Sequence, residues 1–337
     1  MPPGRFRVLP ALVLAVAIIA VGAAPASATF PGPNGRIAFN GFVEETESLE
    51  IFTANPNGED VQQLTSNPNV FSELPDWSPD GQRIAFYRER IDVDQPVQIH
   101  VMNADGSDVT QLTRGPGFHG FPAWSPDGGS LAIAADWGDY AALRGIWIIP
   151  ASDPGGVTRQ EARRVTTRPA DIRGEDSEPQ FSPDGSSIVF TRFKSFRKSA
   201  IHRVGIDGTG LERLTPWRLN ASDPDWSPNG KKITFDSGDA ARRGQSGNIY
   251  VMRADGSGRN RLTDHPPLRR GRPSRGQSLA NNPVWSPSGT QIMFTRFTHK
   301  ASKLVAQRGP QGDEHVVLGG RFGRRHFPNK VDWGTHP

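Results

Sequence analysis

The segment Pro75-Asp76-Trp77-Ser78-Pro79-Asp80-Gly81 decides the fold, because close copies of it recur along the chain. The shared pattern is Pro-x-aromatic-Ser-Pro-x-Gly, and the other full copies begin at Pro122, Pro179, Pro224 and Pro283. Repeats of roughly 40–50 residues, lengthened by loop insertions, are typical of four-stranded propeller blades. The sequence is therefore organised as one repeat array rather than as separate domains.

Each copy leads into strand-like sequence. After the first copy, residues 83–86 and 99–102 form two runs rich in β-branched and aromatic residues. An Asp-Gly turn at Asp105-Gly106 and a short run at residues 111–113 follow. Asp-Gly between strand-like runs is a strong hairpin signal, because glycine accepts the positive φ of a tight turn. Each repeat therefore predicts four short strands, a to d.

The two ends of the chain complete the repeat count. Residues 34–39, 50–53 and 61–65 match strands b, c and d, and no strand a precedes them. Lys330-Val331-Asp332-Trp333-Gly334 matches a strand a with no strands after it. Joining these segments in one blade closes the ring without free sheet edges. We expect an all-β fold, a six-bladed β-propeller of four-stranded antiparallel blades, over residues 29–337.

One aromatic position recurs in every predicted blade. It is occupied by Trp77, Trp124, Phe181, Trp226, Trp285 and Trp333. An aromatic residue repeated on an inner strand is expected to pack between blades.

The Pro-x-Trp-Ser-Pro-Asp-Gly phrase resembles the WD40-like PD40 repeat of the TolB-like β-propeller family. The resemblance covers essentially all of residues 29–337 and implies the propeller fold. The same repeat occurs in the propellers of prolyl-oligopeptidase-type and tricorn-type proteases and in oligogalacturonate lyase. It therefore implies a fold more specifically than a function.

Composition narrows the class of protein. Charged residues make up 22% and hydrophobic residues 35%, which is typical of a globular protein and not of a multi-spanning membrane protein. Cysteine is absent, which excludes disulfides, thiol catalysis and thiolate metal sites. The formal net charge of +4 says little about partners.

The first 28 residues read as a secretory signal peptide. Arg5 and Arg7 precede an apolar stretch at 8–22, and Ala26-Ser27-Ala28 is a small-x-small cleavage site. We expect a secreted or extracytoplasmic protein, in a periplasm or cell-wall space. A retained membrane anchor is the alternative.

The two ends of the predicted ring differ. The a–b and c–d turns are short and alike, whereas the b–c and blade-to-blade loops, such as 136–144 and 264–282, are long and unlike one another. Irregular loops on rigid strands commonly carry function. We expect the loop end to bind and the turn end to be scaffold.

Polar residues just ahead of the inner-strand prolines are predicted to surround the channel mouth at the loop end. They are Glu73, His119, Asp176, Glu178, Asp223, Asn281 and Asn282. Such carboxylates and amides suit a ligand, a peptide or a cation. The alternative is that they cap strand ends and bind channel water.

Basic residues and two further tryptophans fall in the same loops. The predicted partner-binding residues are Arg242, Arg243, Arg269, Arg270, Arg272, Arg275, Arg324 and Arg325, with Trp137 and Trp217 as exposed aromatics. They suit a protein or an anionic cell-envelope polymer. Solvated loops and simple loop packing are the alternatives. Nucleic acid is not expected, because no aromatic residues are interleaved with the arginines of the 268–277 stretch.

Catalytic patterns are weak. Gly244-Gln245-Ser246-Gly247 breaks the G-x-S-x-G pattern of serine hydrolases. His119, His265, His299 and His326 fall in predicted loops, but no His-x-His or His-Glu-x-x-His pair occurs. We therefore expect a non-catalytic, monomeric binding scaffold without a cofactor or metal. A polysaccharide-active, lyase-like enzyme with its site at the channel mouth is the alternative.

Overall fold

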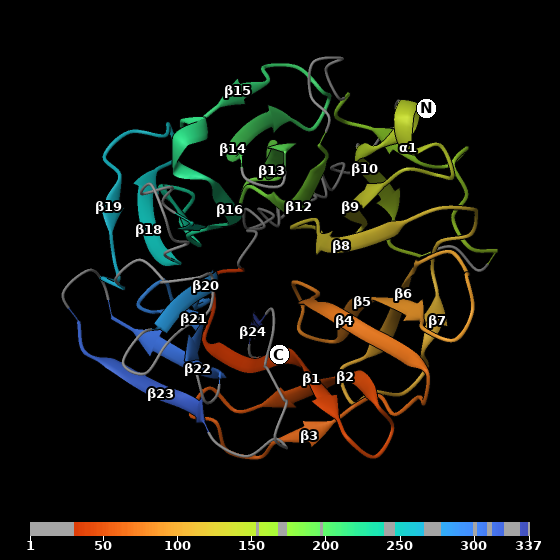
Figure 1. Ribbon diagram of the computed structural model, residues 1–337, viewed down its shortest axis with the longest axis horizontal. Coiled ribbons are helices and arrows are strands. Elements are labelled where there is room, and N and C mark those ends of the chain that lie inside the picture. Colours follow the sequence, from red (N-terminus) through yellow and green to blue (C-terminus); the bar gives the residue numbers. More distant parts are fainter. Residues whose placement is uncertain are drawn as a thin grey trace, which may run out of the picture.

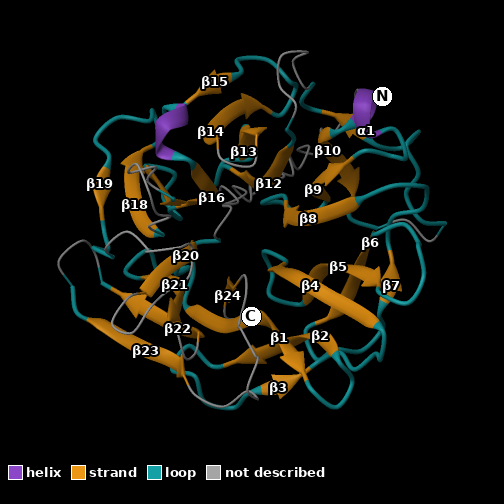
Figure 2. Cartoon of the chain, viewed as in Figure 1, coloured by secondary structure: helices purple, strands orange, loops and turns teal. Residues whose placement is uncertain are grey.

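The computed structural model describes residues 30–152, 155–167, 174–195, 198–238, 247–265, 278–298, 302–308, 312–319 and 331–335. Its strands form six four-stranded sheets, which stand as blades around one axis (Figure 1). Figure 2 shows how little helix accompanies them. The predicted six-bladed β-propeller is confirmed. The predicted signal peptide lies outside the described residues.

The first three blades run from the inner strand a to the outer strand d. Blade 1 contains β24 (Val331–Thr335), β1 (Asn34–Val43), β2 (Ser48–Ala54) and β3 (Gln62–Gln63). Blade 2 contains β4 (Val70–Trp77), β5 (Arg83–Arg90), β6 (Gln98–Asn103) and β7 (Thr110–Gln111). Blade 3 contains β8 (His119–Trp124), β9 (Ser130–Ala135), β10 (Gly145–Pro150) and β11 (Arg163–Arg164).

The other three blades repeat this order. Blade 4 contains β12 (Asp176–Phe181), β13 (Ser187–Ser195), β14 (Lys198–Gly205) and β15 (Glu212–Arg213). Blade 5 contains β16 (Ala221–Trp226), β17 (Lys232–Ser237), β18 (Asn248–Arg253) and β19 (Asn260–Arg261). Blade 6 contains β20 (Ser278–Trp285), β21 (Ile292–Thr298), β22 (Ser302–Gln307) and β23 (Glu314–Gly319).

Two short helical elements lie in loops. They are α1 (Tyr140–Leu143), between strands b and c of blade 3, and the 3-10 helix η1 (Trp217–Leu219), between blades 4 and 5. No helix within the described ranges is long and apolar enough to cross a membrane.

The C-terminal strand closes the ring as predicted. β24 pairs antiparallel with β1, and Trp333 lies opposite Ile37. Asp332 also reaches the next blade, where its Oδ2 accepts a hydrogen bond from the backbone N–H of Trp77 at 2.6 Å. Strands from the two ends of the chain therefore share one sheet, and this sheet is tied directly to blade 2.

The repeated aromatic residues pack between blades, which confirms their predicted role. Trp77 is 3% exposed and lies in a cluster with Ala38 and Ile51 of blade 1. Trp226 is equally buried against Val189 and Ile201 of blade 4. Burial of one such ring stabilises the fold by about 3–5 kcal/mol, judged from truncation to alanine. The core is thus a series of blade-to-blade clusters.

The turn after each aromatic is held by its own side chains. Ser125 Oγ donates to Asp127 Oδ1 at 2.6 Å and accepts from the N–H of Ser130 at 2.9 Å. Hydrogen bonds from Ser125 and from the Gly129 N–H lower the pKa of Asp127. Gly128 has a φ of 68°, and a Cβ there would lie 3.4 Å from Pro79 Cγ of the previous blade. Serine, aspartate and glycine therefore each have a local reason to recur.

Candidate binding site at the loop end of the channel

Strand a bends at the same point in five blades. Just before the proline, one non-glycine residue adopts the left-handed conformation, with φ between 48° and 55°. These residues are Leu74, Phe121, Glu178, Asp223 and Asn282. The pairing with strand b shifts register at the same place in each blade. Left-handed backbone costs a non-glycine residue about 1–2 kcal/mol, and such strain often clusters at functional sites.

The bend decides which neighbouring side chains reach the channel mouth. Two positions before the left-handed residue, every side chain is buried, with the residue at most 1% exposed. The residues at that position are Ser72, His119, Asp176, Ala221 and Ala280. The prediction that His119 and Asp176 line an accessible mouth is therefore wrong. Counting back from the proline gave the wrong side of the strand for these two residues.

His119 is enclosed at the top of blade 3. Its Nδ1 lies 3.2 Å from Gln98 Oε1, and its ring centre lies 4.2 Å from that of Trp137. Burial lowers the pKa of His119 to about 4, so the ring is neutral at neutral pH. Trp137 is only 5% exposed and also contacts Trp147, edge to face. The prediction that Trp137 is an exposed aromatic is wrong, because its indole covers His119.

Asp176 forms a buried ion pair with Arg192. Arg192 Nε donates to its Oδ1 at 2.6 Å, and Arg192 Nη2 donates to its Oδ2 at 2.7 Å. The two side chains are 0% and 3% exposed. This bidentate pair joins β12 to β13 beneath the mouth, so its charges are not available to a ligand.

The other five residues predicted to surround the channel mouth are Glu73, Glu178, Asp223, Asn281 and Asn282, and their role in binding stays a prediction. Glu73, Asp223, Asn281 and Asn282 are half-buried. Glu178 is 9% exposed, and its Oε2 accepts from Thr191 Oγ1 at 2.6 Å and from the N–H of Asp223 at 2.8 Å. Glu178 therefore couples the mouth of blade 4 to that of blade 5. Burial raises the pKa of Glu73 above its usual range.

A small cavity of about 20 Å³ lies among the inner strands next to Asp223 and Asn282. Its polar lining comprises Asp76, Gln180, Asp223, Asp225, Asn282 and Asp332. That volume holds about one water molecule.

The histidines proposed for a metal site do not converge where they can be placed. His119 lies on blade 3, whereas His265 follows β19 of blade 5 and bonds Ser278 Oγ at 2.8 Å. His299 and His326 lie outside the described residues. Within the described ranges, no three His, Asp or Glu side chains are placed to hold a metal ion.

Comparisons with known proteins agree with this geometry. The family described as TolB beta propeller domain matches residues 157–323, which span blades 4 to 6 and the end of blade 3. The chain belongs to the TolB-like β-propeller family.

Relatives of this TolB-like propeller differ in length. An uncharacterised protein of Agrobacterium fabrum is 27% identical over 74% of this chain and 92% of its own. The Tol-Pal system protein TolB of Bordetella pertussis is 30% identical over 51% of this chain but only 35% of its own. The crystal structure of TolB from Acinetobacter baumannii superposes with a TM-score of 0.69 at 19% identity, over 90% of this chain and 67% of that one. At that identity the superposition shows the fold alone.

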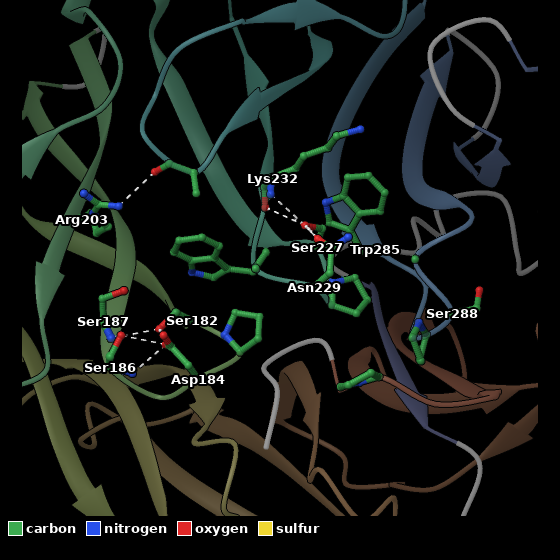
Figure 3. Close-up of a pocket in the computed structure, with 18 residues that line it drawn as sticks. Ser182, Asp184, Ser186, Ser187, Arg203, Ser227, Asn229, Lys232, Trp285 and Ser288 are labelled. Atoms are coloured by element: carbon green, nitrogen blue, oxygen red, sulfur yellow. Dashed lines mark hydrogen bonds between the residues drawn. The ribbon is translucent and has the colours of Figure 1, made fainter. Parts of the chain in front are cut away.

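The turn end of the TolB-like propeller holds a cavity that sequence reasoning missed (Figure 3). About 820 Å³ lies between Pro31 and the a–b turns of blades 4, 5 and 6. The turn side chains bond one another, as Ser182 does to Asp184 and Ser227 to Asn229. Arg203 on its wall is paired with Glu212 at 2.9 Å. The repeats carry no signal for this cavity, because Pro31 precedes the first of them.

The predicted basic loops are not described. Arg242, Arg243, Arg269, Arg270, Arg272, Arg275, Arg324 and Arg325 all lie outside the described residues. Trp217 is described and is half-buried at the loop end.

Proposed function

We propose that this protein is an exported, non-catalytic scaffold that binds a protein or a cell-envelope component over the loop-end mouth of its propeller. The observation that carries the proposal is the ring of strained residues at the mouth. Five blades share one backbone conformation there, yet the five side chains are leucine, phenylalanine, glutamate, aspartate and asparagine. A constant backbone that carries varied side chains is suited to specific recognition.

The strain itself supports this interpretation. Glycine would adopt the left-handed conformation at little cost, so each larger residue must contribute through its side chain. Leu74 contributes by burial, and Glu178 contributes by bonding Thr191 and the Asp223 N–H. The side chains of Phe121 and Asn282 keep part of their surface in solvent. We assign that surface to a partner.

The family context favours a protein partner. The Bordetella relative is named as a component of the Tol-Pal system, although this chain spans only 35% of it. A docking surface made of the mouth alone needs no catalytic group. The lyase-like alternative is not proposed, because the two described histidines that it invokes lie on blades 3 and 5.

Site-specific photo-crosslinking on intact cells tests the proposal. Phe121→p-benzoylphenylalanine exchanges one aromatic ring for another at the mouth, and the same residue at Lys231 samples the exposed turn end. We expect a discrete adduct from position 121 and none from position 231. Adducts from both positions, or from neither, would refute a partner at the mouth.

A second measurement keeps the result independent of the crosslinker. Asn282→Gly removes a mouth side chain while suiting the left-handed backbone, so the fold is expected to persist. Recovery of the position 121 adduct should fall several-fold when this substitution is combined with the crosslinker. Unchanged recovery would show that the mouth side chains do not recognise the partner.

A further inference from the structure

Trp217 stands on a rigid turn between blades 4 and 5. The turn ends at Asn220, which is left-handed, and Asn220 Oδ1 accepts from the N–H of Ser199 at 3.2 Å and from its Oγ at 3.1 Å. On the other side, Ser237 Oγ donates to the carbonyl of Leu219. The turn is therefore fixed to β14 of blade 4 and to β17 of blade 5, and it holds the indole in one place.

An uncharged ring supports one side of this indole. The centre of the His202 ring lies 5.5 Å from that of Trp217, and His202 in turn stacks on Phe190 at 5.6 Å. His202 is 5% exposed, and burial lowers its pKa to about 4. The indole is thus seated on neutral aromatic groups and remains half-buried.

Two cations lie over the half-buried indole ring. Arg213 Cζ lies 5.4 Å and Lys194 Nζ lies 5.9 Å from the ring centre. Arg218, in the middle of η1, and Lys198, the first residue of β14, are both exposed. In the described part of the chain, no carboxylate lies within ion-pair distance of Arg213, Arg218 or Lys198. We call Trp217, Lys194, Lys198, Arg213 and Arg218 the Trp217 patch.

We propose that the Trp217 patch binds an anionic glycan, with a pyranose ring against the indole and its carboxylate or sulfate groups on the surrounding cations. The C–H faces of a sugar are apolar and suit an aromatic plane, and guanidinium groups bind such anions bidentately. The core of a protein interface is depleted of charged residues, whereas this patch places four cations around one indole. The exposed large apolar side chains among the described residues, such as Leu211 and Val316, are not part of the patch.

This inference deepens the proposed function, since it names a cell-envelope chemistry for the loop end, but it concerns other residues. If the crosslinker at position 121 gives no adduct while glycan binding persists, the partner site at the mouth is refuted and the glycan site at the Trp217 patch is not. The reverse result would refute the patch alone.

Affinity electrophoresis of the whole protein measures the binding. The gels contain alginate, dextran sulfate or neutral dextran, so that carboxylated and sulfated glycans are compared with an uncharged one. We expect retardation by alginate, dextran sulfate or both, and none by dextran. Absence of retardation in both anionic gels would overturn the proposal.

Substitutions then assign the binding to the patch. Trp217→Ala should weaken affinity about tenfold, which is the effect of losing a stacking contact of about 1.4 kcal/mol. Trp217→Phe should retain affinity within about threefold if stacking is the contact. Arg213→Gln should weaken binding several-fold, whereas Lys231→Gln at the turn end should not. Binding by Trp217→Ala equal to that of the wild type would overturn the proposal.

Two further probes separate the glycan from other polyanions. Poly-glutamate represents an acidic protein surface, and single-stranded oligothymidine represents a nucleic acid. We expect both to compete with alginate at least tenfold more weakly. Equal competition by either probe would show that the patch binds any polyanion without recognising a sugar, which would overturn the glycan proposal. Unchanged thermal unfolding of Arg213→Gln and Trp217→Phe would confirm that these variants test binding in a folded protein.

Discussion

Replacing Asp236 by asparagine should change how stability depends on pH. Asp236 lies on β17, is 6% exposed, and its Oδ1 accepts from Ser222 Oγ at 2.6 Å. Burial raises the pKa of Asp236 to about 7, and the nearby Glu178 carboxylate acts in the same direction. Asparagine has nearly the same shape, can still accept from Ser222, and does not titrate.

The sign of the effect follows from proton binding. The carboxyl is protonated in the folded protein up to about pH 7, but in the unfolded chain it loses its proton near its ordinary value of 3.8. Stability from this group is therefore complete below about pH 4 and is lost as pH rises through about 7. A difference of about 3 pH units at about 1.4 kcal/mol each corresponds to a loss of about 4 kcal/mol.

Buried histidines act in the opposite direction. Burial lowers the pKa values of His100, His119 and His202 to about 4. Because each binds its proton less readily when folded, these residues add stability as pH rises from about 4 to 6.5. In the pH dependence of the wild-type free energy of unfolding, the contribution of the histidines offsets that of Asp236. Subtracting the wild-type curve from that of Asp236→Asn removes the histidine contribution and leaves that of Asp236.

Urea unfolding at several pH values between 4.5 and 8.5 provides the measurement. The free energy of unfolding of Asp236→Asn, relative to wild type, should rise by about 1.4 kcal/mol per pH unit up to about pH 7 and then level off. Asp207→Asn is the control. Asp207 is an exposed turn carboxylate whose pKa is lowered by hydrogen bonds from Thr209, so its difference curve should be flat in this range. A flat curve for Asp236→Asn would refute the reasoning.

Two other substitutions test the packing. Trp333→Ala removes a ring that is 2% exposed in the closing strand, so urea unfolding should show a loss of about 3–5 kcal/mol. A loss below about 1 kcal/mol would mean that β24 does not hold the ring closed. Arg192→Met leaves Asp176 buried without its partner and should cost about 3–5 kcal/mol at neutral pH. The double variant Arg192→Met/Asp176→Leu should recover most of that loss, and failure to recover it would contradict the assignment of the penalty to an unpaired charge.

The repeat predicted the fold well because its residues act locally. Ser125 and Asp127 bond within their own turn, and Gly128 accepts a positive φ beside the previous blade. Asp76 accepts from the N–H of Trp124 at 2.8 Å, one blade on. Contacts that recur at fixed sequence positions leave a fixed sequence pattern. Ring closure was predictable for the same reason, since Asp332 and Trp333 repeat the Asp76-Trp77 pair.

The site was predicted less well because its decisive feature has no residue signature. Leucine, phenylalanine and glutamate share no preference for the left-handed conformation, and only the following proline marks the position. Unless the position of the bend is known, the sequence does not show which side chains of strand a face the channel. The prediction for His119 and Asp176 therefore fails, because both side chains lie on the buried side of the strand. Trp137 was misjudged for another reason: its burial depends on His119, a contact between segments that the sequence does not pair.

The two ends of the ring differ in how their side chains are bonded and in which residues adopt the left-handed conformation. At the turn end the side chains bond one another, as in the Ser182–Asp184 pair, and the a–b turns place glycine at the position of positive φ. At the loop end the strain falls on residues with side chains, and Glu178 carries hydrogen bonds from one blade to the next. Phe121 contacts Phe118 with ring centres 6.0 Å apart and Asn282 lines the small cavity, yet both residues keep part of their surface in solvent. Under the proposed function, recognition at the mouth can differ between propellers of the same fold, because the residues at this bend share a backbone conformation and not a side chain.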